Sequence, residues 1–439
     1  MINRVIGHSR SVAATAHVTW KGVLALTFAW GCLPAVRAAD YWVATGGRDA
    51  TGWGSSTRPW ATLQYAANQI RPGDTVHVRD GEYEGFDLRR GGTREALVCF
   101  KAEGKTVRIV RRNRKTPDGI NVEGAGYVII EGFVVNEMPR AGVRGALSPH
   151  LTIRLIHADR NGSWGILTGF CDDVMVVNNV VSNCVREHGI YVGNSGDRPI
   201  IRGNVSKGNR SCGIHINGDQ SQGGDGIISG AVVENNLIYG NGRAGGSAIN
   251  CDGVQDSTIR NNLLYDNHKS GISLYREDGA AGSKNNRVIN NTIVMPRSAR
   301  WAVNIKDGST GNVVRNNILF HEDRSRGSIN IDAGSLPGFQ SDFNIVVDRF
   351  SPDDGDQVMS LSRWQSTTGL DRHSIVATPQ RVFVSPDASD FRLKDDSPAI
   401  DAADPSVAPP HDLEGRPRPV GSRPDIGAFE NQSNLEPGR

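Results

Sequence analysis

The sequence is poor in the features that mark several large classes of protein. Its formal net charge is only +2 at pH 7, with 49 basic and 47 acidic residues among 439, so charge predicts neither nucleic-acid binding nor membrane attachment. The middle of the chain has no helical periodicity and no leucine-rich repeat consensus. Cysteine is scarce, with six residues, and no spacing resembles a zinc site. Helical repeats, zinc modules and nucleic-acid-binding domains are therefore not expected.

The first residues have the composition of a leader peptide. Basic residues precede an apolar run over residues 22–36, and small residues offer a cleavage site before Ala39. The run is too short for a membrane span, so we predict a secretory signal peptide at 1–38 and a secreted or periplasmic protein. A lipoprotein anchor at Cys32 is the alternative, which the preceding Ala-Trp-Gly disfavours. Cleavage removes four basic and no acidic residues, which changes the net charge from +2 to −2.

Five cysteines remain after cleavage, an odd number that leaves at least one thiol unpaired. Cys171 and Cys184 form the only locally plausible disulfide. Cys251 takes an inward strand position and is expected to be a small core residue.

A branched aliphatic residue recurs between small and polar neighbours at intervals of 23 to 35 residues. Such a period indicates a solenoid, in which one short unit stacks on itself. Asparagines recur in phase with it; stacked at one corner of each coil, they can form an amide ladder, and asparagine tolerates the left-handed backbone of a tight corner. The aliphatic residues are Ile120, Val143, Ile166, Ile190, Ile214, Ile249, Ile272, Val303 and Ile329, and the asparagines are Asn179, Asn204, Asn236, Asn262, Asn291 and Asn317.

The strands within each coil indicate the type of solenoid. Around the repeated aliphatic residues, apolar and polar residues alternate, which places Ile214 and Ile216, for example, on the inner face. A second set of Val- and Ile-rich segments lies between Gly, Asn and Asp corners, and roughly three short strands fit one coil at about 3.3 Å per residue. We therefore predict an all-β, single-stranded parallel β-helix, right-handed by the usual rule for parallel crossovers.

Both ends of the solenoid are expected to be capped. Residues 57–70, TRPWATLQYAANQI, have the spacing of an amphipathic helix that covers the first coil. We divide the mature chain into an N-terminal cap with the first strands at 39–100, coils at 101–350 and a C-terminal capping segment at 351–439. With both ends covered, nothing demands an oligomer, so a monomer is expected.

Two segments resemble a known family. Residues 41–83, YWVATGGRDATGWGSSTRPWATLQYAANQIRPGDTVHVRDGEY, are similar to the first segment of secreted bacterial right-handed β-helix proteins, including polysaccharide lyase family 9, which is pectate-lyase-like. Residues 391–430, from FRLKDDSPAIDAAD to GRPRPVGSRPDIGAFE, resemble the closing segment of many such proteins. The resemblance implies a carbohydrate-active β-helix. Lyases of this fold use calcium with a Lys or Arg base.

Function is sought on the outward side chains of the repeated strand, because a fold alone does not assign one. Successive rungs lie about 4.8 Å apart, so outward residues form columns. The first column is Asn121, Arg144, Leu167, Tyr191, His215, Asn250, Ser273, Asn304 and Asn330, and the adjacent column is Glu123, Gly145, Gly169, Gly193, Asn217, Asp252, Tyr275, Lys306 and Asp332.

Two insertions are expected to wall a groove over these columns. The intervals after Ile214 and Ile272 are 35 and 31 residues, and part of each excess, DQSQGGDGIISG and REDGAAGSKNN, directly follows the outward strand. Binding groups concentrate on loops held by a rigid scaffold. The predicted centre of the groove comprises His215, Asn250, Asp252, Tyr275 and Arg276.

These side chains suit a linear polysaccharide that carries uronate carboxylates. Cleavage by β-elimination needs a group that neutralises the carboxylate, a base for the C5 proton and an acid for the leaving oxygen. We predict that Arg276 and Asn250 neutralise and that Tyr275, His215 or Lys306 is the base, a tyrosine also returning the proton. Tyr191, Asn217, Lys269 and Asn304 join Asn250 as substrate-binding candidates.

Calcium is a candidate cofactor because the resemblance implies it. The oxygen ligands nominated are Asp219, Asp225 and Asp252, with Asn217 beside them. The calcium site of family 9 is built from several clustered aspartates, and the sequence shows no such cluster.

Other interpretations stay open. A uronate epimerase shares the first proton abstraction, although the Asp-Pro-His-Asp motif of alginate epimerases is absent. A polygalacturonate hydrolase needs paired aspartates and Gly-His-Gly; Asp172 and Asp173 are the nearest pair, but no Gly-His-Gly follows. A non-catalytic glycan-binding or surface-structural β-helix is the remaining class, since exposed residues such as Lys306 and Asp252 are often merely solvated.

Overall fold

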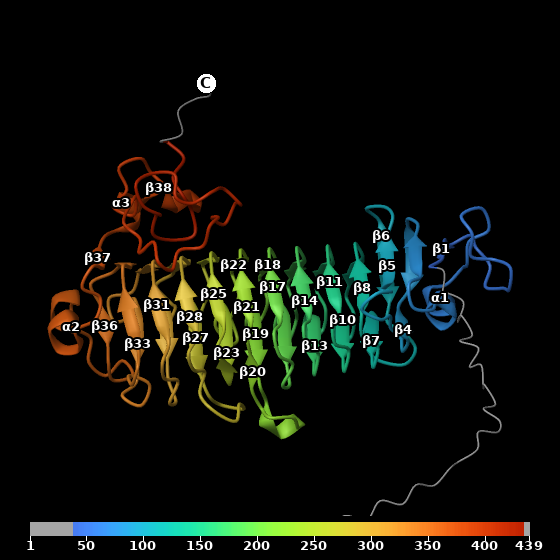
Figure 1. Ribbon diagram of the computed structural model, residues 1–439, viewed down its shortest axis with the longest axis horizontal. Coiled ribbons are helices and arrows are strands. Elements are labelled where there is room, and N and C mark those ends of the chain that lie inside the picture. Colours follow the sequence, from blue (N-terminus) through green and yellow to red (C-terminus); the bar gives the residue numbers. More distant parts are fainter. Residues whose placement is uncertain (1–37, 434–439) are drawn as a thin grey trace, which may run out of the picture. The chain divides into compact units, whose positions relative to one another are not determined.

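The predicted repeat is a coil of three parallel strands, stacked along one axis (Figure 1). The computed structural model describes residues 38–433. The predicted signal peptide, apart from its last residue, and Cys32 lie outside these residues. Within the described part the fold is the predicted all-β right-handed solenoid, with three long sheets that run its whole length. The sheets extend beyond the predicted coil boundaries of 101 and 350, because β1 and β37 belong to them as well.

The first sheet has twelve strands. In spatial order they are β1 (Asp40–Val43), β2 (Thr75–Val78), β5 (Val98–Ala102), β8 (Val128–Glu131), β11 (Thr152–Arg154), β14 (Met175–Val177), β17 (Ile200–Arg202), β21 (Val232–Glu234), β25 (Thr258–Arg260), β28 (Arg287–Ile289), β31 (Val313–Arg315) and β34 (Gln340–Asp342).

The second sheet has eleven strands and carries the columns predicted from the sequence. Its strands are β4 (Phe86–Leu88), β7 (Ile120–Glu123), β10 (Ala141–Ala146), β13 (Trp164–Gly169), β16 (Ile190–Gly193), β19 (Ile214–Asn217), β23 (Ile249–Asp252), β27 (Ile272–Tyr275), β30 (Val303–Ile305), β33 (Ile329–Ile331) and β36 (Phe350–Ser351).

The third sheet again has twelve strands. They are β3 (Gly81–Glu84), β6 (Val107–Arg111), β9 (Val134–Asn136), β12 (His157–Asp159), β15 (Val180–Ser182), β18 (Val205–Lys207), β22 (Leu237–Tyr239), β26 (Leu263–Tyr265), β29 (Thr292–Met295), β32 (Ile318–His321), β35 (Ile345–Val346) and β37 (Ile375–Val376). Two short pairs complete the described strands: β20 (Ile228–Ser229) with β24 (Val254–Gln255), and β38 (Phe383–Ser385) with β39 (Asp390–Leu393).

The register of the second sheet follows the repeated aliphatic residues. Each pairs with the next along the whole series, as Ile214 does with Ile249, and their side chains are fully buried in the core. The first outward column is therefore confirmed. The second column is wrong at one rung, because Glu123 is level with Ala146, not Gly145. The second outward position lies three residues after the buried aliphatic residue, and three residues after Val143 is Ala146.

The asparagine ladder is confirmed and runs one rung further than predicted. The amide nitrogen of Asn236 donates 2.9 Å hydrogen bonds to the carbonyl oxygen of Ile201 and to the side-chain oxygen of Asn262, and the series continues to Asn344. The second residue of each doublet forms the ladder, while the first, such as Asn235 with φ 56°, takes the left-handed conformation. One doublet thus supplies both the buried ladder and the tight corner.

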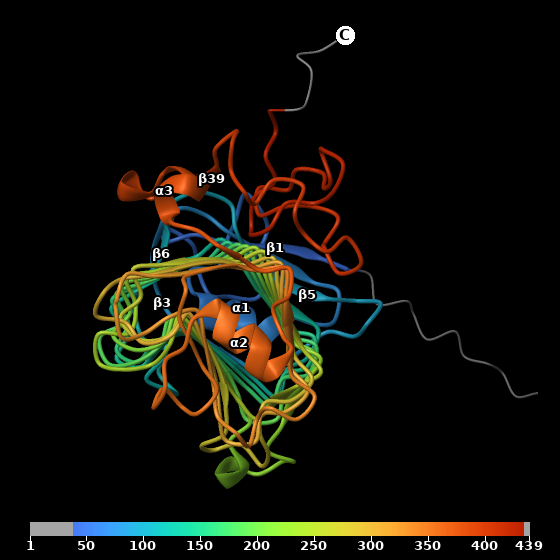
Figure 2. The same ribbon diagram turned by 90° about the vertical axis from the view of Figure 1, so that its left-hand side faces the viewer.

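Helices cover the two ends of the solenoid. The predicted N-terminal helix is α1 (Leu63–Gln69), which Thr62 caps and whose leucine and alanines are buried. At the other end lies α2 (Leu361–Thr368), whose fully buried Trp364 stacks on Phe350 at 5.2 Å. Viewed along the axis (Figure 2), both helices lie over the cross-section of the coils. Each covers apolar side chains that an end coil would otherwise expose to water.

The rest of the C-terminal segment does not cover an end. It contains the short helix α3 (Pro379–Val382) and the 3-10 turn η2 (Pro386–Ala388). The other 3-10 turn of the described residues, η1 (Gln220–Gln222), lies in the loop after β19. Phe383 and Phe391 from the C-terminal segment pack with Phe320 on the outer face of the third sheet, where they form a second apolar core. The capping role predicted for residues 351–439 therefore belongs to α2, while the tail covers the side of the coils (Figure 1).

The five cysteines of the described chain are free. Cys171 and Cys184, the pair that seemed plausible as a disulfide, are separately buried, and burial raises the pKa of each thiol, to about 11 and about 12. Cys251 is fully buried in the core as predicted. Across residues 38–433, no helix has the length and apolar character needed to cross a membrane.

Candidate functional site

A cleft of about 410 Å³ lies on the second sheet over β23, β27 and β30. Its floor is formed by outward side chains of the two predicted columns. One rim is formed by the turns that precede the strands, and the other includes Glu277 after β27 and Asp307 after β30. The residues that line it are His188, Ser211, Cys212, Gly245, Gly246, Ser247, Asn250, Lys269, Ser270, Ser273, Tyr275, Glu277, Arg300, Asn304, Lys306 and Asp307. Of the predicted site residues, the cleft thus brings together Asn250, Lys269, Tyr275, Asn304 and Lys306.

Tyr275 lies at the end of β27 with its phenol in the cleft. Asn250 on the neighbouring strand donates a 2.7 Å hydrogen bond to the phenol oxygen. Burial, and then the nearby carboxylate of Asp252, raise the pKa of Tyr275 well above its usual value of 10. At neutral pH the side chain is therefore a neutral phenol, held in one orientation by Asn250.

Three cations face the same cleft: Lys269, Arg300 and Lys306. The ammonium group of Lys306 lies 2.8 Å from a carboxylate oxygen of Asp354, and this contact raises the pKa of Lys306. Lys306 is accordingly a cation at neutral pH and a poor proton acceptor. Lys269 is half-buried and Arg300 is exposed at the rim. The lining also contains the carboxylates of Glu277 and Asp307, so the three cations outnumber the acidic groups by one.

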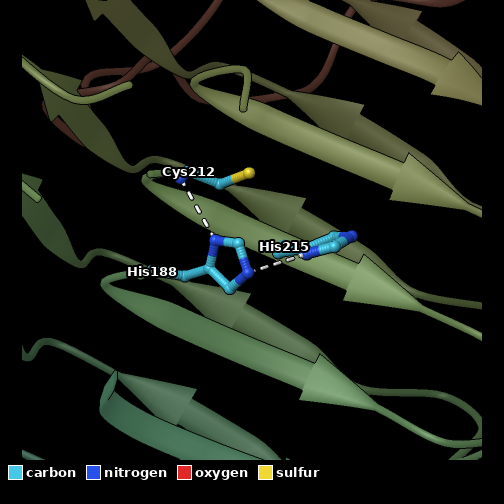
Figure 3. Close-up of side chains that lie close together, drawn as sticks. All are labelled: His188, Cys212 and His215. Atoms are coloured by element: carbon cyan, nitrogen blue, oxygen red, sulfur yellow. Dashed lines mark hydrogen bonds between the residues drawn. The ribbon is translucent and has the colours of Figure 1, made fainter. Parts of the chain in front are cut away.

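His215 does not line the cleft, although β19 adjoins it. Its Nδ1 lies 3.2 Å from Nε2 of His188, which in turn receives a 3.2 Å hydrogen bond at Nδ1 from the backbone N–H of Cys212 (Figure 3). Burial lowers the pKa of His188 to about 4, and burial together with His188 lowers the pKa of His215 well below 6.5. Both rings are neutral at neutral pH, and neither presents a free nitrogen to a substrate over β27.

The outward residues nearer the N-terminal end form a separate group. Tyr191 stacks on Trp164 at 5.8 Å, and its hydroxyl oxygen accepts a 3.2 Å hydrogen bond from the side-chain amide of Asn217. Asn217 also donates to Asp278 at 3.2 Å. These two substrate-binding candidates continue the second sheet beyond the cleft, where they hold each other and the loop after β27.

The predicted calcium ligands do not converge. Both carboxylate oxygens of Asp252 accept backbone N–H groups of the loop after β27, from Glu277, Asp278 and Gly279 at 2.8–3.0 Å. Asp219 caps η1. Among residues 38–433, Asp219, Asp225 and Asp252 do not form a cluster of carboxylate oxygens close enough to share an ion. The residues nominated therefore do not fit calcium, and calcium dependence stays a prediction.

The two predicted insertions lie on the expected side but meet each other. Backbone bonds join Gln220 to Asp278 at 2.9 Å and Ala280 to Gly226 at 3.0 Å, and the two loops project side by side from the solenoid (Figure 1). Glu277 is the cleft residue that they supply, whereas Arg276 is exposed and outside the lining. The opposite rim, including Arg300, was not predicted from the sequence, although the part of each long interval that precedes the next strand indicated it.

The chain matches the family described as "Right handed beta helix region" over residues 99–224 and 226–319, half of its length, and it belongs to that family. No curated protein sequence matches it. Among solved structures, it is similar to the pectate lyase Pel9A, with a TM-score of 0.61 and 18% identity over 90% of this chain and 97% of that one.

Two further structures show the same fold. A structure described as XylC in complex with xylose has a TM-score of 0.54 and 10% identity over 90% of this chain and 98% of that one. A rhamnogalacturonan lyase has a TM-score of 0.51 and 13% identity over 70% of this chain and 87% of that one. At these identities the likeness concerns the fold, and the function must come from the cleft itself.

Proposed function

We propose that this protein binds an acidic, uronate-containing polysaccharide in the cleft over β27 and cleaves it by β-elimination. The observation that carries the proposal is the position of the Tyr275 phenol, oriented by Asn250 on the floor of a cleft that also holds Lys269, Arg300 and Lys306. The pectate lyase and rhamnogalacturonan lyase that share the fold are consistent with this reaction class.

The cations account for binding and for the acidity of the substrate. A uronate carboxylate can accept charge-assisted hydrogen bonds from Lys269, Arg300 or Lys306. Neutralising that carboxylate stabilises the negative charge that develops on C5 and the carboxyl group when the proton leaves, and such fixed charges are strong contributors in a partly dry site. Arg276, predicted for this role, is replaced in the proposal by Arg300, which lines the cleft.

Tyr275 is the group proposed to move the proton. Because the phenol is neutral at neutral pH, it first loses its proton to solvent. The phenolate then takes the proton from C5; the C5–H electron pair becomes the C4=C5 double bond, and the C4–O4 bond breaks. The phenol so formed then gives the same proton to O4, so proton and charge balance. Of the three bases predicted, His215 has its Nδ1 against His188 and Lys306 is held as a cation by Asp354.

The product distinguishes elimination from its alternatives. The purified protein is incubated with alginate, pectate, glucuronan and glycosaminoglycans, with calcium and with chelator, and the fragments are weighed by mass spectrometry. Elimination yields fragments whose masses add up to the parent chain, and hydrolysis adds one water for each cut. Unchanged chain length with inverted C5 centres indicates an epimerase, and unchanged glycan indicates a binding protein. Either of these outcomes, or hydrolysis, overturns the proposal.

The compartment follows from the same proposal. Polysaccharides of this kind lie outside the cytoplasm, and the predicted signal peptide at 1–38 would deliver the chain there, either secreted or periplasmic. N-terminal sequencing of protein exported by a bacterial host tests this point: a mature chain that begins at Ala39 is expected, and retention of residues 1–38 contradicts it.

A further inference from the structure

Three potential metal ligands from two neighbouring coils meet at one wall of the cleft. His188 lies just before β16, Cys212 just before β19, and His215 on β19 itself. One ligand atom from each lies within 4.8 Å of the other two, and Figure 3 shows the two rings and the thiol on adjacent coils. Among the described residues, this is the group of histidine, cysteine and carboxylate side chains that converges in this way.

The hydrogen bonds leave this cluster incompletely satisfied. Because Nδ1 of His188 accepts the N–H of Cys212, a neutral His188 must carry its proton on Nε2 and donate it to Nδ1 of His215. His215 then carries its own proton on Nε2. That nitrogen is buried and has no hydrogen-bond partner, in a residue that is 9% exposed. An unpaired polar atom of this kind is costly, and it stays unpaired in the proposed metal-bound form, so the case for a metal site rests on the convergence of the three ligand atoms.

We propose that His188, Cys212 and His215 bind one divalent transition-metal ion, with zinc as the class that fits best. Imidazole nitrogens and a thiolate are the ligands that zinc prefers, whereas calcium requires oxygen. Two nitrogen ligands of a tetrahedral zinc ion lie about 3.3 Å apart at bond lengths of about 2.0 Å. Nε2 of His188 and Nδ1 of His215 are 3.2 Å apart.

Binding has a definite proton balance. The thiol of Cys212 loses its proton to solvent and ligates as the thiolate. The Nε2 proton of His188 moves to Nδ1, so the ring stays neutral and its hydrogen bond from the Cys212 N–H is lost. His215 keeps its proton on Nε2. One proton is released for each ion, and two neutral hydrogen bonds, Cys212 N–H to His188 and His188 to His215, are exchanged for metal–ligand bonds.

The cluster leaves room for a further ligand on the cleft side. His188 and Cys212 both line the cleft, so water or an oxygen of a bound glycan can complete the coordination. A site with three protein ligands and one open position is the arrangement of catalytic rather than closed structural zinc sites. The metal site does not depend on the elimination chemistry assigned to Tyr275, and each can hold if the other fails.

Cobalt and zinc titrations test this inference on the purified, tag-free protein after metal has been removed with chelator. Cobalt is expected to bind one ion per chain with a thiolate-to-cobalt absorption band in the near ultraviolet, and zinc is expected to displace it. Competition with a chromophoric chelator gives the zinc affinity. Calcium, added in excess, is expected to leave the band unchanged.

Three variants locate the site. Cys212→Ala should abolish the band. Both Cys212→Ala and His188→Asn should weaken zinc binding by at least roughly 100-fold, because losing a ligand costs more than the 10–100-fold typical of losing an outer-shell partner. Cys99→Ala, a cysteine of a distant coil, is the matched control and should bind as the wild type does. Zinc should raise the melting temperature of the wild type and of Cys99→Ala. Absence of the band in the wild type, or its survival in both ligand variants, overturns the proposal.

Discussion

The side-chain amide of Asn250 donates a 2.7 Å hydrogen bond to the phenol oxygen of Tyr275, across the neighbouring strands β23 and β27. Both side chains stand on the outer face of the second sheet, and the bond fixes the phenol over the cleft floor. The phenol proposed to transfer the proton is therefore carried by one strand and held in place by its neighbour, and strands of a rigid scaffold position it more firmly than a loop would.

Asn250→Ala is expected to lower kcat about 10-fold, since a lost hydrogen bond of about 1 kcal/mol also frees the phenol to rotate. KM should change little, because the cations that hold the glycan remain. Kinetics on the cleaved glycan and thermal unfolding of the same preparation check this. A wild-type kcat in the variant would show that Asn250 does not orient Tyr275.

The rate of cleavage is expected to rise with pH across the neutral and alkaline range. Burial raises the pKa of Tyr275 well above 10, so the phenolate fraction grows with each unit of pH up to the limit set by unfolding. The measurement is kcat/KM against pH, with the circular dichroism signal followed in parallel. A maximum in the acidic range would be incompatible with a tyrosine base.

Asn236→Ala is expected to destabilise the solenoid by about 2–6 kcal/mol. Asn236 is fully buried, and its removal leaves the backbone N–H of Asn204 and the carbonyl oxygen of Ile201 without partners, each costing about 1–3 kcal/mol. Asn235→Gly is the matched control, because glycine accepts the φ of 56° at that position. Chemical denaturation compares the two. Equal losses of unfolding free energy in the two variants would show that the asparagine ladder contributes no more to stability than the corner residue.

His77 is expected to make stability depend on pH at the first coil. Burial lowers its pKa, but hydrogen bonds to Glu103 and Asp40 prevail and raise it above 6.5. The folded state therefore binds the proton more tightly. The resulting stabilisation is fully present below pH 6.5 and is lost as the pH rises through the folded value. Because the partners are partly exposed, it amounts to about 0.5–1 kcal/mol.

Unfolding free energies of the wild type and of His77→Gln, measured at several pH values, check this. The two proteins should differ most at the acidic end and converge at alkaline pH. A difference in unfolding free energy that grows with pH would contradict a raised pKa for His77.

Some parts of this structure are predictable from the sequence, and others are not. The register of the second sheet could be read from Ile214 and its repeats, because a coil that must bury one face repeats its apolar residues at fixed places. The outward positions of Tyr275 and Lys306 were predicted from the same repeat. His188 could not be recognised, since it lies in a corner before β16, where residue spacing does not fix the direction of a side chain.

Asp252 shows a second limit of sequence reasoning. An acidic residue at an outward position was interpreted as a calcium ligand, whereas its oxygens bind the backbone of the loop after β27. Loop backbones have unpaired N–H groups that must find acceptors, and the sequence does not reveal which carboxylate will serve them.

The most direct test of the central claim is the ultraviolet absorbance of unsaturated uronate produced from the glycan panel by wild type, Tyr275→Phe and Tyr265→Phe. Tyr265 packs between Tyr239 and Phe391, away from the cleft, and serves as the matched control. A rising signal is expected for wild type and Tyr265→Phe. Tyr275→Phe is expected to be slower by roughly 10²–10⁴-fold with an unchanged melting temperature. An undiminished signal from Tyr275→Phe, or no signal from the wild type on any of these glycans, would contradict the central claim.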